Sequence, residues 1–263
     1  MKGRVLVVAG SDSGGGAGIQ ADIKTITALG AYAATAITAL TAQNTEAVLG
    51  VVPVAPDFVR LQIEAVLRDI GADCIKTGML LDGAVIAAVA DALEALAADV
   101  PLVLDPVMIA SSGARLLAED AVGLLKRRLI PRARLVTPNV PEAEALTGLA
   151  VASLDDMRRA ADALLSMGAG AVMVKGGHLP GPVVRDLVVD GGGGFVIEVP
   201  RIETRSTHGT GCTLASGIAA GLAQGLPLRP AIERAHAWLQ RAIATAPGFG
   251  RGHGPLNHAP DIV

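Results

Sequence analysis

Aromatic residues, cysteines and long apolar runs are all scarce in this chain of 263 residues. Trp, Tyr and Phe together supply 2% of it, and there are two cysteines. Two cysteines cannot form a disulfide framework, but a chain of this length can bury a stable core without one. No apolar stretch approaches the roughly 20 residues that a membrane-spanning helix needs, because charges or glycines interrupt each one. We therefore expect a protein that neither crosses a membrane nor depends on disulfides.

Net positive charge is also missing. The 22 basic and 25 acidic residues give a formal charge of −3 at pH 7. No basic surface is therefore expected to attract nucleic acid, while a small neutral or anionic ligand remains open. The opening segment Met1-Lys2-Gly3-Arg4 does not resemble a secretion signal. Together with the two cysteines, this favours the cytoplasm.

Short β-branched runs alternate with longer amphipathic runs, which predicts a mostly parallel sheet covered by helices on both faces. The expected strands are Val5–Ala9, Thr35–Leu40, Cys74–Lys76, Leu102–Leu104, Leu135–Val136 and Ala171–Lys175. The expected helices are Gly18–Leu29, Pro56–Ile70, Ala84–Ala97, Ala118–Arg127, Val140–Leu146, Asp155–Met167, Gly211–Gln224 and Leu228–Ala246. An antiparallel hairpin is expected at Asp186–Val199, with glycines of positive φ in its turn. We find no internal repeat or linker, so residues 1–263 are expected to form one α/β domain.

Polar segments follow each of these expected parallel strands. They are Ser11-Asp12, Gln43-Asn44, Thr77-Gly78-Met79, Asp105-Pro106, Thr137-Pro138-Asn139 and Lys175-Gly176-Gly177. Open α/β sheets bind ligands at the carboxyl ends of their parallel strands. We therefore expect a ligand site at this edge of the sheet.

A glycine-rich turn, Gly209-Thr210-Gly211-Cys212, precedes a helix of small residues. The first amides of a helix have no intrahelical acceptor and point together toward an anion, so we interpret this turn as an anion site. An ordinary tight turn is the alternative. The helix dipole is expected to lower the pKa of the Cys212 thiol, which makes Cys212 a candidate general base. An inert buried cysteine is the alternative, and we assign that role to Cys74.

The segment Ser11–Asp22 joins a strand to a helix and is rich in glycine. It is not a dinucleotide-binding motif, because no register gives G-x-G-x-x-G, and it has no P-loop lysine. We interpret it as a backbone-lined wall against a small flat ligand, with Asp22 available as a polar contact.

Three further residues are candidates for phosphate and metal binding. Asn139 and Glu142 lie three residues apart at an expected helix start, where they are either magnesium-side residues or a simple cap. Lys175 ends a strand at the same edge and can neutralise a transferring phosphoryl group, unless it is merely a solvated strand-end lysine. The five histidines form no metal-ligand spacing, so His178 and His208 are interpreted as supporting residues.

Several segments together resemble one known family. They are Gly10–Asp22, Thr38–Thr45, Lys76–Leu80, Asp105–Met108, Thr137–Asn139 and His208–Thr213. They are similar to the hydroxymethylpyrimidine and phosphomethylpyrimidine kinases of thiamine biosynthesis, within the ribokinase-like superfamily, and the resemblance extends from Val5 to Gly250–Pro255. It implies a three-layer α/β/α fold, ATP and Mg²⁺. It also implies two successive phosphorylations of 4-amino-5-hydroxymethyl-2-methylpyrimidine, to the monophosphate and then the diphosphate.

The resemblance also suggests residue roles. Gln43 would bind the aminopyrimidine edge, since an amide both donates and accepts hydrogen bonds. The other expected pyrimidine contacts are Gly10, Ala17, Asp22, Met79 and Val107. The expected ATP contacts are Asp105, Thr137, Asn139, Lys175, Thr207 and Gly209, with Asn139 and Glu142 on the magnesium side. The catalytic group would be Lys175, Gly209, Thr210, Gly211 and Cys212. We further expect a homodimer.

Two alternatives remain open. Most of the superfamily has an aspartate where this chain has Cys212, and this departure is shared with the pyrimidine kinases and a cysteine-bearing branch of pyridoxal kinases. Those pyridoxal kinases have a second cysteine in the lid, whereas Ile109–Gly113 here has none, and the composition of Ile109–Arg115 permits a mobile lid. The second alternative is a ligand-binding sensor that has lost catalysis. The intact Lys175 and Cys212 argue against it.

Overall fold

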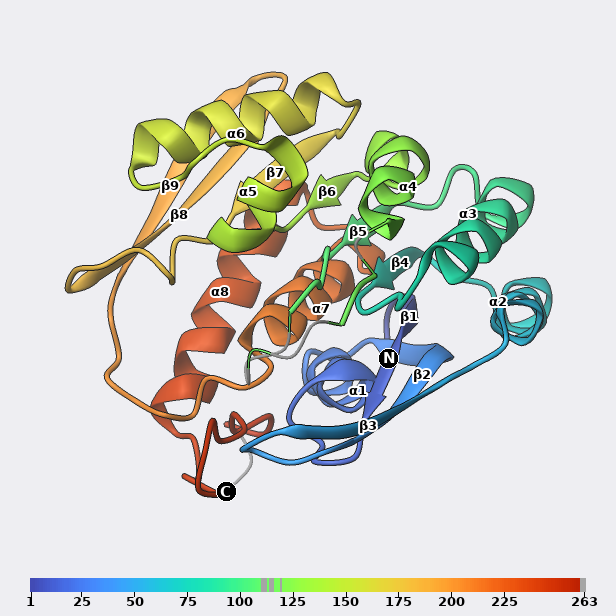
Figure 1. The fold of residues 1–263 in the computed structure, drawn as a ribbon, viewed down its shortest axis with the longest axis horizontal. Coiled ribbons are helices and arrows are strands. Elements are labelled where there is room, and N and C mark those ends of the chain that lie inside the picture. The colour runs from blue at the N-terminus through green and yellow to red at the C-terminus, as the bar shows by residue number, and fades with distance from the viewer. Residues whose placement is uncertain (110–112, 114–115, 119, 261–263) are drawn as a thin grey trace.

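The computed structural model describes residues 1–109, 113, 116–118 and 120–260, and within them nine strands form one sheet (Figure 1). The expected lid at Ile109–Arg115 lies mostly outside these residues. The strands are β1 Arg4–Asp12, β2 Tyr32–Gln43, β3 Val48–Pro53, β4 Cys74–Thr77, β5 Leu102–Leu104, β6 Leu135–Val136, β7 Ala171–Val174, β8 Val183–Asp190 and β9 Gly193–Pro200. Their order in the sheet is β3-β2-β1-β4-β5-β6-β7-β8-β9.

The strand order reverses at β1. This strand pairs in parallel with β2 on one side and with β4 on the other. The parallel arrangement continues through β5 and β6 to β7, while β3, β8 and β9 add antiparallel pairs at the two edges. The expected mostly parallel sheet is therefore confirmed, and its reversal point is where such sheets place their ligands.

Helices cover both faces of the sheet, as the parallel arrangement requires. They are α1 Gly18–Ala28, α2 Pro56–Asp69, α3 Gly83–Leu96, α4 Ala121–Arg128, α5 Val140–Thr147, α6 Leu154–Ser166, α7 Thr210–Ala223 and α8 Leu228–Ala244, with a short 3₁₀ turn η1 at Ile130–Arg132. Helices α2 to α6 pack on one face, and α1, α7 and α8 pack on the other (Figure 1). The three-layer α/β/α fold is confirmed.

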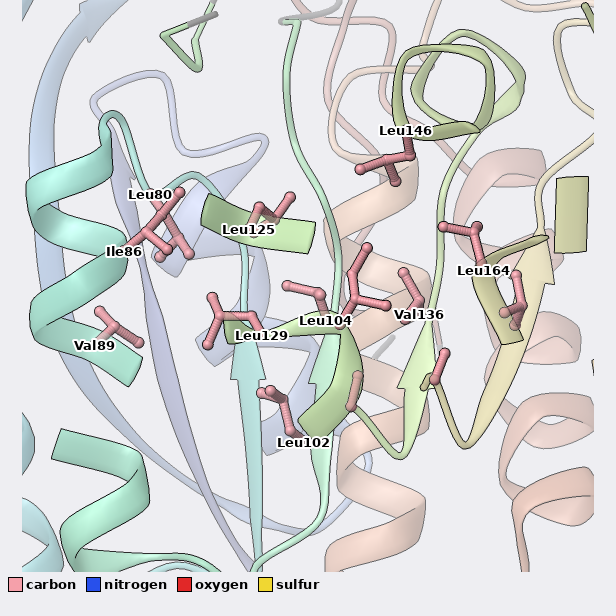
Figure 2. Close-up of a cluster of buried hydrophobic side chains, with 14 of the residues drawn as sticks. Leu80, Ile86, Val89, Leu102, Leu104, Leu125, Leu129, Val136, Leu146 and Leu164 are labelled. Atoms are coloured by element: carbon pink, nitrogen blue, oxygen red, sulfur yellow. The ribbon is translucent and has the colours of Figure 1, made fainter. Parts of the chain in front are cut away.

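Two apolar cores fill the spaces between these layers. Alternate residues of β1 point to opposite faces, so Leu6 and Val8 join one core while Val5 and Val7 join the other. Figure 2 shows the first core, where leucines of β5 lie among side chains from α3, α4, α5 and α6. Burial on both faces explains why the strands read as unbroken apolar runs.

Besides shifts at the ends of several elements, such as the longer β1 and β2, the structure differs from the expected elements at two places. Strand β3 was not expected, because this edge strand is largely exposed and ends in Pro53, so no burial pattern marks it. In the hairpin, Asp190 pairs with Gly193, and of the four glycines at 191–194 only Gly193 has a positive φ, of 136°. No helix among the described residues has the length and apolarity to cross a membrane.

Candidate active site

A cavity of about 910 Å³ opens at the carboxyl ends of the parallel strands. Each polar segment that we expected at this edge contributes to its wall. The contributing residues include Asp12 at the end of β1, Gln43 at the end of β2, Met79 after β4, Asp105 after β5, Asn139 after β6 and Lys175 after β7. The prediction that one edge of the sheet collects these residues is confirmed.

The start of α7 forms one side of this cavity. Gly209 caps the helix with a φ of 83°, and a Cβ there would lie 1.9 Å from the Gly16 carbonyl oxygen, so no other residue fits. Gly211 and Cys212 follow in the first turn, where the amides have no intrahelical acceptor. Residues 209–212 all line the cavity, which supports an anion site at this point.

Lys175 places its ammonium beside that helix start. Its Nζ lies 2.9 Å from Asp105 Oδ1 and 3.1 Å from the position that a Cβ on Gly211 would occupy. Burial lowers the pKa of Lys175, but the charges of Asp105 and Glu142 outweigh this effect and raise it, so the side chain is a cation at neutral pH. Its position is that of a cavity residue rather than a solvated lysine.

Thr137 supports Asp105 from behind. Its hydroxyl donates a 3.0 Å hydrogen bond to Asp105 Oδ1, and the residue is wholly buried. Thr137 is not among the residues that line the cavity, so its contact with ATP stays a prediction. Thr207, the other threonine assigned to ATP, does line the cavity, and its hydroxyl lies 3.2 Å from His253 Nδ1.

Asn139 and Glu142 form a capping box at the start of α5. The Glu142 amide donates to Asn139 Oδ1 at 2.9 Å, and the Asn139 amide donates to Glu142 Oε2 at 2.8 Å. Both residues also line the cavity, so the two side chains that cap α5 are the same two that we expect on the magnesium side. Burial, helped by Asp105 and opposed by Lys175, raises the pKa of Glu142 to about 7.

The opposite end of the cavity has a mixed polar and apolar wall. Gly10, Ala17, Gln43, Met79 and Val107 all line it, as expected for residues that contact a flat ring. The Gln43 amide nitrogen lies 3.4 Å from His208 Nε2. This end of the cavity therefore joins backbone, thioether and amide groups around one space.

Asp12 organises the glycine-rich wall, a role that the sequence analysis missed. Its carboxylate accepts hydrogen bonds from the amides of Gly14, Gly16 and Ala17 at 2.8–3.0 Å, and it lies 2.9 Å from His208 Nε2. Burial favours the neutral acid, but the bonds from His208 and Ala17 outweigh it and lower the pKa of Asp12 to about 2. An aspartate just before a run of glycine amides is the sequence signal for such a role.

Cys212 differs from the expectation in its ionisation. Burial of the thiol raises its pKa to about 11, and this effect exceeds the opposing influence of the Lys76 charge. The expected lowering of this pKa is therefore wrong. Cys74 is wholly buried with a pKa raised to about 12 by burial, in agreement with a packing role.

Asp22 is also placed differently from the expectation. It is wholly buried and does not line the cavity, so it offers no polar contact to a ligand there. Its carboxylate instead bonds Lys76 Nζ at 2.9 and 3.0 Å and the Ser216 hydroxyl at 2.7 Å. A lysine within a buried strand pattern was the signal for this pair, but we assigned Lys76 no role.

A further wall comes from β8, β9 and α8, which the sequence analysis did not include. His236 Nε2 lies 3.1 Å from Asp186 Oδ2, and the other oxygen of Asp186 accepts the Gly176 amide at 2.8 Å. Apolar side chains around this pair complete the wall, among them Val184, Pro200, Leu239 and Ile243. The cavity is thus long enough to have two ends of different chemistry.

Comparison with known proteins matches this arrangement. The profile of the family described as phosphomethylpyrimidine kinase matches residues 12–257. The hydroxymethylpyrimidine/phosphomethylpyrimidine kinase of Bacillus subtilis is 48% identical, over 97% of this chain and 94% of the relative. An ADP complex of Bacillus subtilis pyridoxal kinase has the same fold, with a TM-score of 0.92, 34% identity, and coverage of 99% of this chain and 98% of that chain.

A bifunctional protein is similar as well. The thiamine biosynthesis bifunctional protein ThiED of Geobacter sulfurreducens is 52% identical over 98% of this chain, and the matched region spans 52% of that protein's length. The similarity therefore covers about half of ThiED. Because the family profile matches most of the length of this chain, the chain belongs to the phosphomethylpyrimidine kinase family.

Proposed function

We propose that the protein phosphorylates 4-amino-5-hydroxymethyl-2-methylpyrimidine with ATP, and then phosphorylates the monophosphate to the diphosphate, in thiamine biosynthesis. One observation carries this proposal. A single cavity joins a ring-sized wall at Gln43, Met79 and Val107 to an anion site where Lys175 Nζ lies beside the start of α7. The family membership and the names of the relatives support the same activity.

The two ends of the cavity suit the two substrates. The pyrimidine would lie against the glycine-rich wall, with the Gln43 amide on its amino edge. ATP would extend from the wall around His236 to the start of α7, where Gly211, Cys212 and Lys175 would surround the transferring phosphoryl group. Asp105 and Asn139 would contact the nucleotide from the ends of β5 and β6.

Magnesium would bind on the side of Asn139 and Glu142. Within residues 1–109, 113, 116–118 and 120–260, no group of three or more His, Cys, Asp or Glu side chains is arranged to hold a metal ion. Magnesium that arrives with nucleotide phosphates and keeps several waters requires only one such carboxylate, which Glu142 supplies. The ion would neutralise the phosphate charge in the transition state.

The two phosphorylations make different demands on the site. In each, a substrate oxygen attacks the γ-phosphorus of ATP, the bond from that phosphorus to the bridging oxygen breaks, and ADP leaves. The hydroxymethyl oxygen must also lose its proton, whereas an oxygen of the monophosphate is already ionised near neutral pH. Cys212 would accept the proton in the first step alone, so only that step would depend on its thiolate.

Turnover of candidate substrates tests the proposed activity. The purified protein, incubated with Mg-ATP and either the hydroxymethylpyrimidine or pyridoxal, is expected to convert the pyrimidine to the monophosphate and then the diphosphate. Preferential phosphorylation of pyridoxal would favour the main alternative. Binding of the pyrimidine without any ADP formation would favour a non-catalytic sensor and contradict the proposal.

The oligomeric proposal is a homodimer formed through the edge of the sheet at β3. Leu40 and Val52 are cross-strand neighbours there, and their exposed fractions are 48% and 62%. Leu49 of β3 is also exposed, at 74%, and an unprotected apolar edge strand favours pairing with another chain. Val52→Glu is expected to give monomers by light scattering, while Leu149→Glu, on an exposed leucine after α5, leaves dimers.

We also propose that residues 1–263 act as one kinase domain in the cytoplasm. The continuous sheet of the described residues supports one domain, and the two unpaired cysteines suit a reducing compartment where ATP is abundant.

A further inference from the structure

A hydrogen bond connects α1 and α7 beneath the cavity. At the starts of these helices, Gly18 and Cys212 both line the cavity. Four residues further along both helices, the Ser216 hydroxyl donates to Asp22 Oδ1 at 2.7 Å. Residues four apart share one face of a helix, so the Asp22–Ser216 bond lies one turn below the Cys212 thiol.

Lys76 places a buried cation at this lower bond. The side chain comes from β4, is 0% exposed, and has its Nζ 2.9 and 3.0 Å from the two Asp22 oxygens. The same Nζ lies 3.1 Å from the position that a Cβ on Gly78 would occupy, and Gly78 lines the cavity. The ammonium therefore lies directly behind the cavity wall, where any larger residue at position 78 would crowd it.

Stability alone is a weak explanation for this ion pair. Taking a lysine and an aspartate out of water costs several kcal/mol per ion, and well-packed apolar residues of similar size often replace such pairs without loss. The pair also lies next to the reaction site, since Gly78 lines the cavity in front of Lys76 and Ser216 bonds Asp22 one helical turn from Cys212. Its location therefore points to the chemistry of Cys212.

We propose that Lys76 is a positioning residue for the reaction, whose ammonium stabilises the Cys212 thiolate that accepts the hydroxyl proton of the substrate. Asp22 binds the ammonium directly, and the Ser216 hydroxyl of α7 holds Asp22 in place. The proton passes from the substrate oxygen to sulfur as the new oxygen–phosphorus bond forms. The role of Lys76 in catalysis rests on the proposed function. The interaction between the Lys76 ammonium and the Cys212 thiolate does not depend on it.

The charges around Cys212 agree with this role. After burial, the largest influence on the pKa of the thiol is Lys76, which lowers it, while Asp22 and Asp105 raise it. Lys175 is a further cation whose charge interacts with Cys212. Lys76 and Asp22 thus shift the pKa of Cys212 in opposite directions, as their opposite charges require.

Alkylation of Cys212 by iodoacetamide tests the inference, because only the thiolate reacts and no substrate is needed. Cys74→Ala removes the other thiol from every variant. At pH 9, Lys76→Met is expected to slow alkylation about tenfold and Asp22→Asn to speed it about tenfold, as a pKa shift of about one unit in each direction requires. Lys2→Met removes an equal charge from the exposed N-terminal region and should leave the rate unchanged.

Unchanged rates in the folded variants, or shifts of the same sign in both, would overturn the inference. If Lys76→Met does not fold, Asp22→Asn carries the test alone, because the asparagine keeps an oxygen acceptor for Lys76 and Ser216. Only a faster reaction in that variant supports the inference. If the protein proves not to be a kinase, alkylation still measures the interaction, and if turnover occurs without the opposite shifts, the inference fails alone.

Turnover adds a second readout. Lys76→Met is expected to lower kcat for the hydroxymethyl substrate about tenfold while KM stays within about twofold. The rate on the monophosphate should change little, since its attacking oxygen is already ionised. Equal losses on both substrates would indicate a structural effect and contradict the positioning role.

Discussion

Lys175 Nζ lies 2.9 Å from Asp105 Oδ1, and this ion pair directs the ammonium toward the start of α7. The two residues come from the ends of β7 and β5, which lie on either side of β6 in the sheet. Neither side chain is fixed by its neighbours in sequence. The sheet order brings them together, and the pair is the most direct evidence for a charged transfer site.

Replacement of Lys175 tests that site. Lys175→Met is expected to lower kcat about 100-fold or more, because a fixed cation beside the transferring phosphoryl group stabilises the transition state. Lys175→Arg keeps the charge and should retain more activity, and calorimetry should show that ATP still binds. A loss below about threefold in Lys175→Met would show that the lysine is only a strand-end residue.

Glu142→Gln and Asn139→Ala separate capping from metal binding. Glutamine keeps the oxygen that accepts the Asn139 amide, so Glu142→Gln should retain the thermal midpoint while the Mg²⁺ concentration for half-maximal rate rises several-fold. Asn139→Ala loses the cap and should cost about 1 kcal/mol of stability. An unchanged Mg²⁺ requirement in Glu142→Gln would remove Glu142 from the metal side.

The stability of the fold should depend on His258 at mildly acidic pH. Its Nε2 lies 3.0 Å from the Thr213 hydroxyl, and burial lowers the pKa of His258 to about 4. Between about pH 6.5 and 4 the imidazole of His258 is protonated in the unfolded chain but not in the folded chain. The free energy of unfolding therefore decreases by up to about 3 kcal/mol as the pH is lowered through this range. His258→Gln should reduce that slope in urea unfolding, and an unaltered slope would show that the histidine titrates normally.

Much of the fold was predictable because its signals are local. Strands buried on both faces, such as β5 and β7, produce short apolar runs, and the polar residues that follow them mark the ligand edge. Strand β3 gave no such signal, since its residues are largely exposed.

The residues of the site were easier to predict from the sequence than the pKa values of its ionisable groups. Glycine is required at position 209 because the backbone has a positive φ there and contacts Gly16. Such a requirement can be recognised in the sequence as a glycine-rich motif. The pKa of Cys212 depends on burial and on Lys76, which lies 136 positions earlier in the sequence. Only the folded arrangement shows that the thiol is less acidic than its place at a helix start suggests.

The central claim is that one site performs both phosphorylations and needs the Cys212 thiolate only for the first. The most direct test compares the wild-type protein with Cys212→Ala on the purified hydroxymethylpyrimidine and on its monophosphate, with Cys212→Ser as a control of similar size. We expect the alanine variant to lose at least about 100-fold in the rate of the first step and less than about tenfold in the second. Equal losses on the two substrates would contradict the claim.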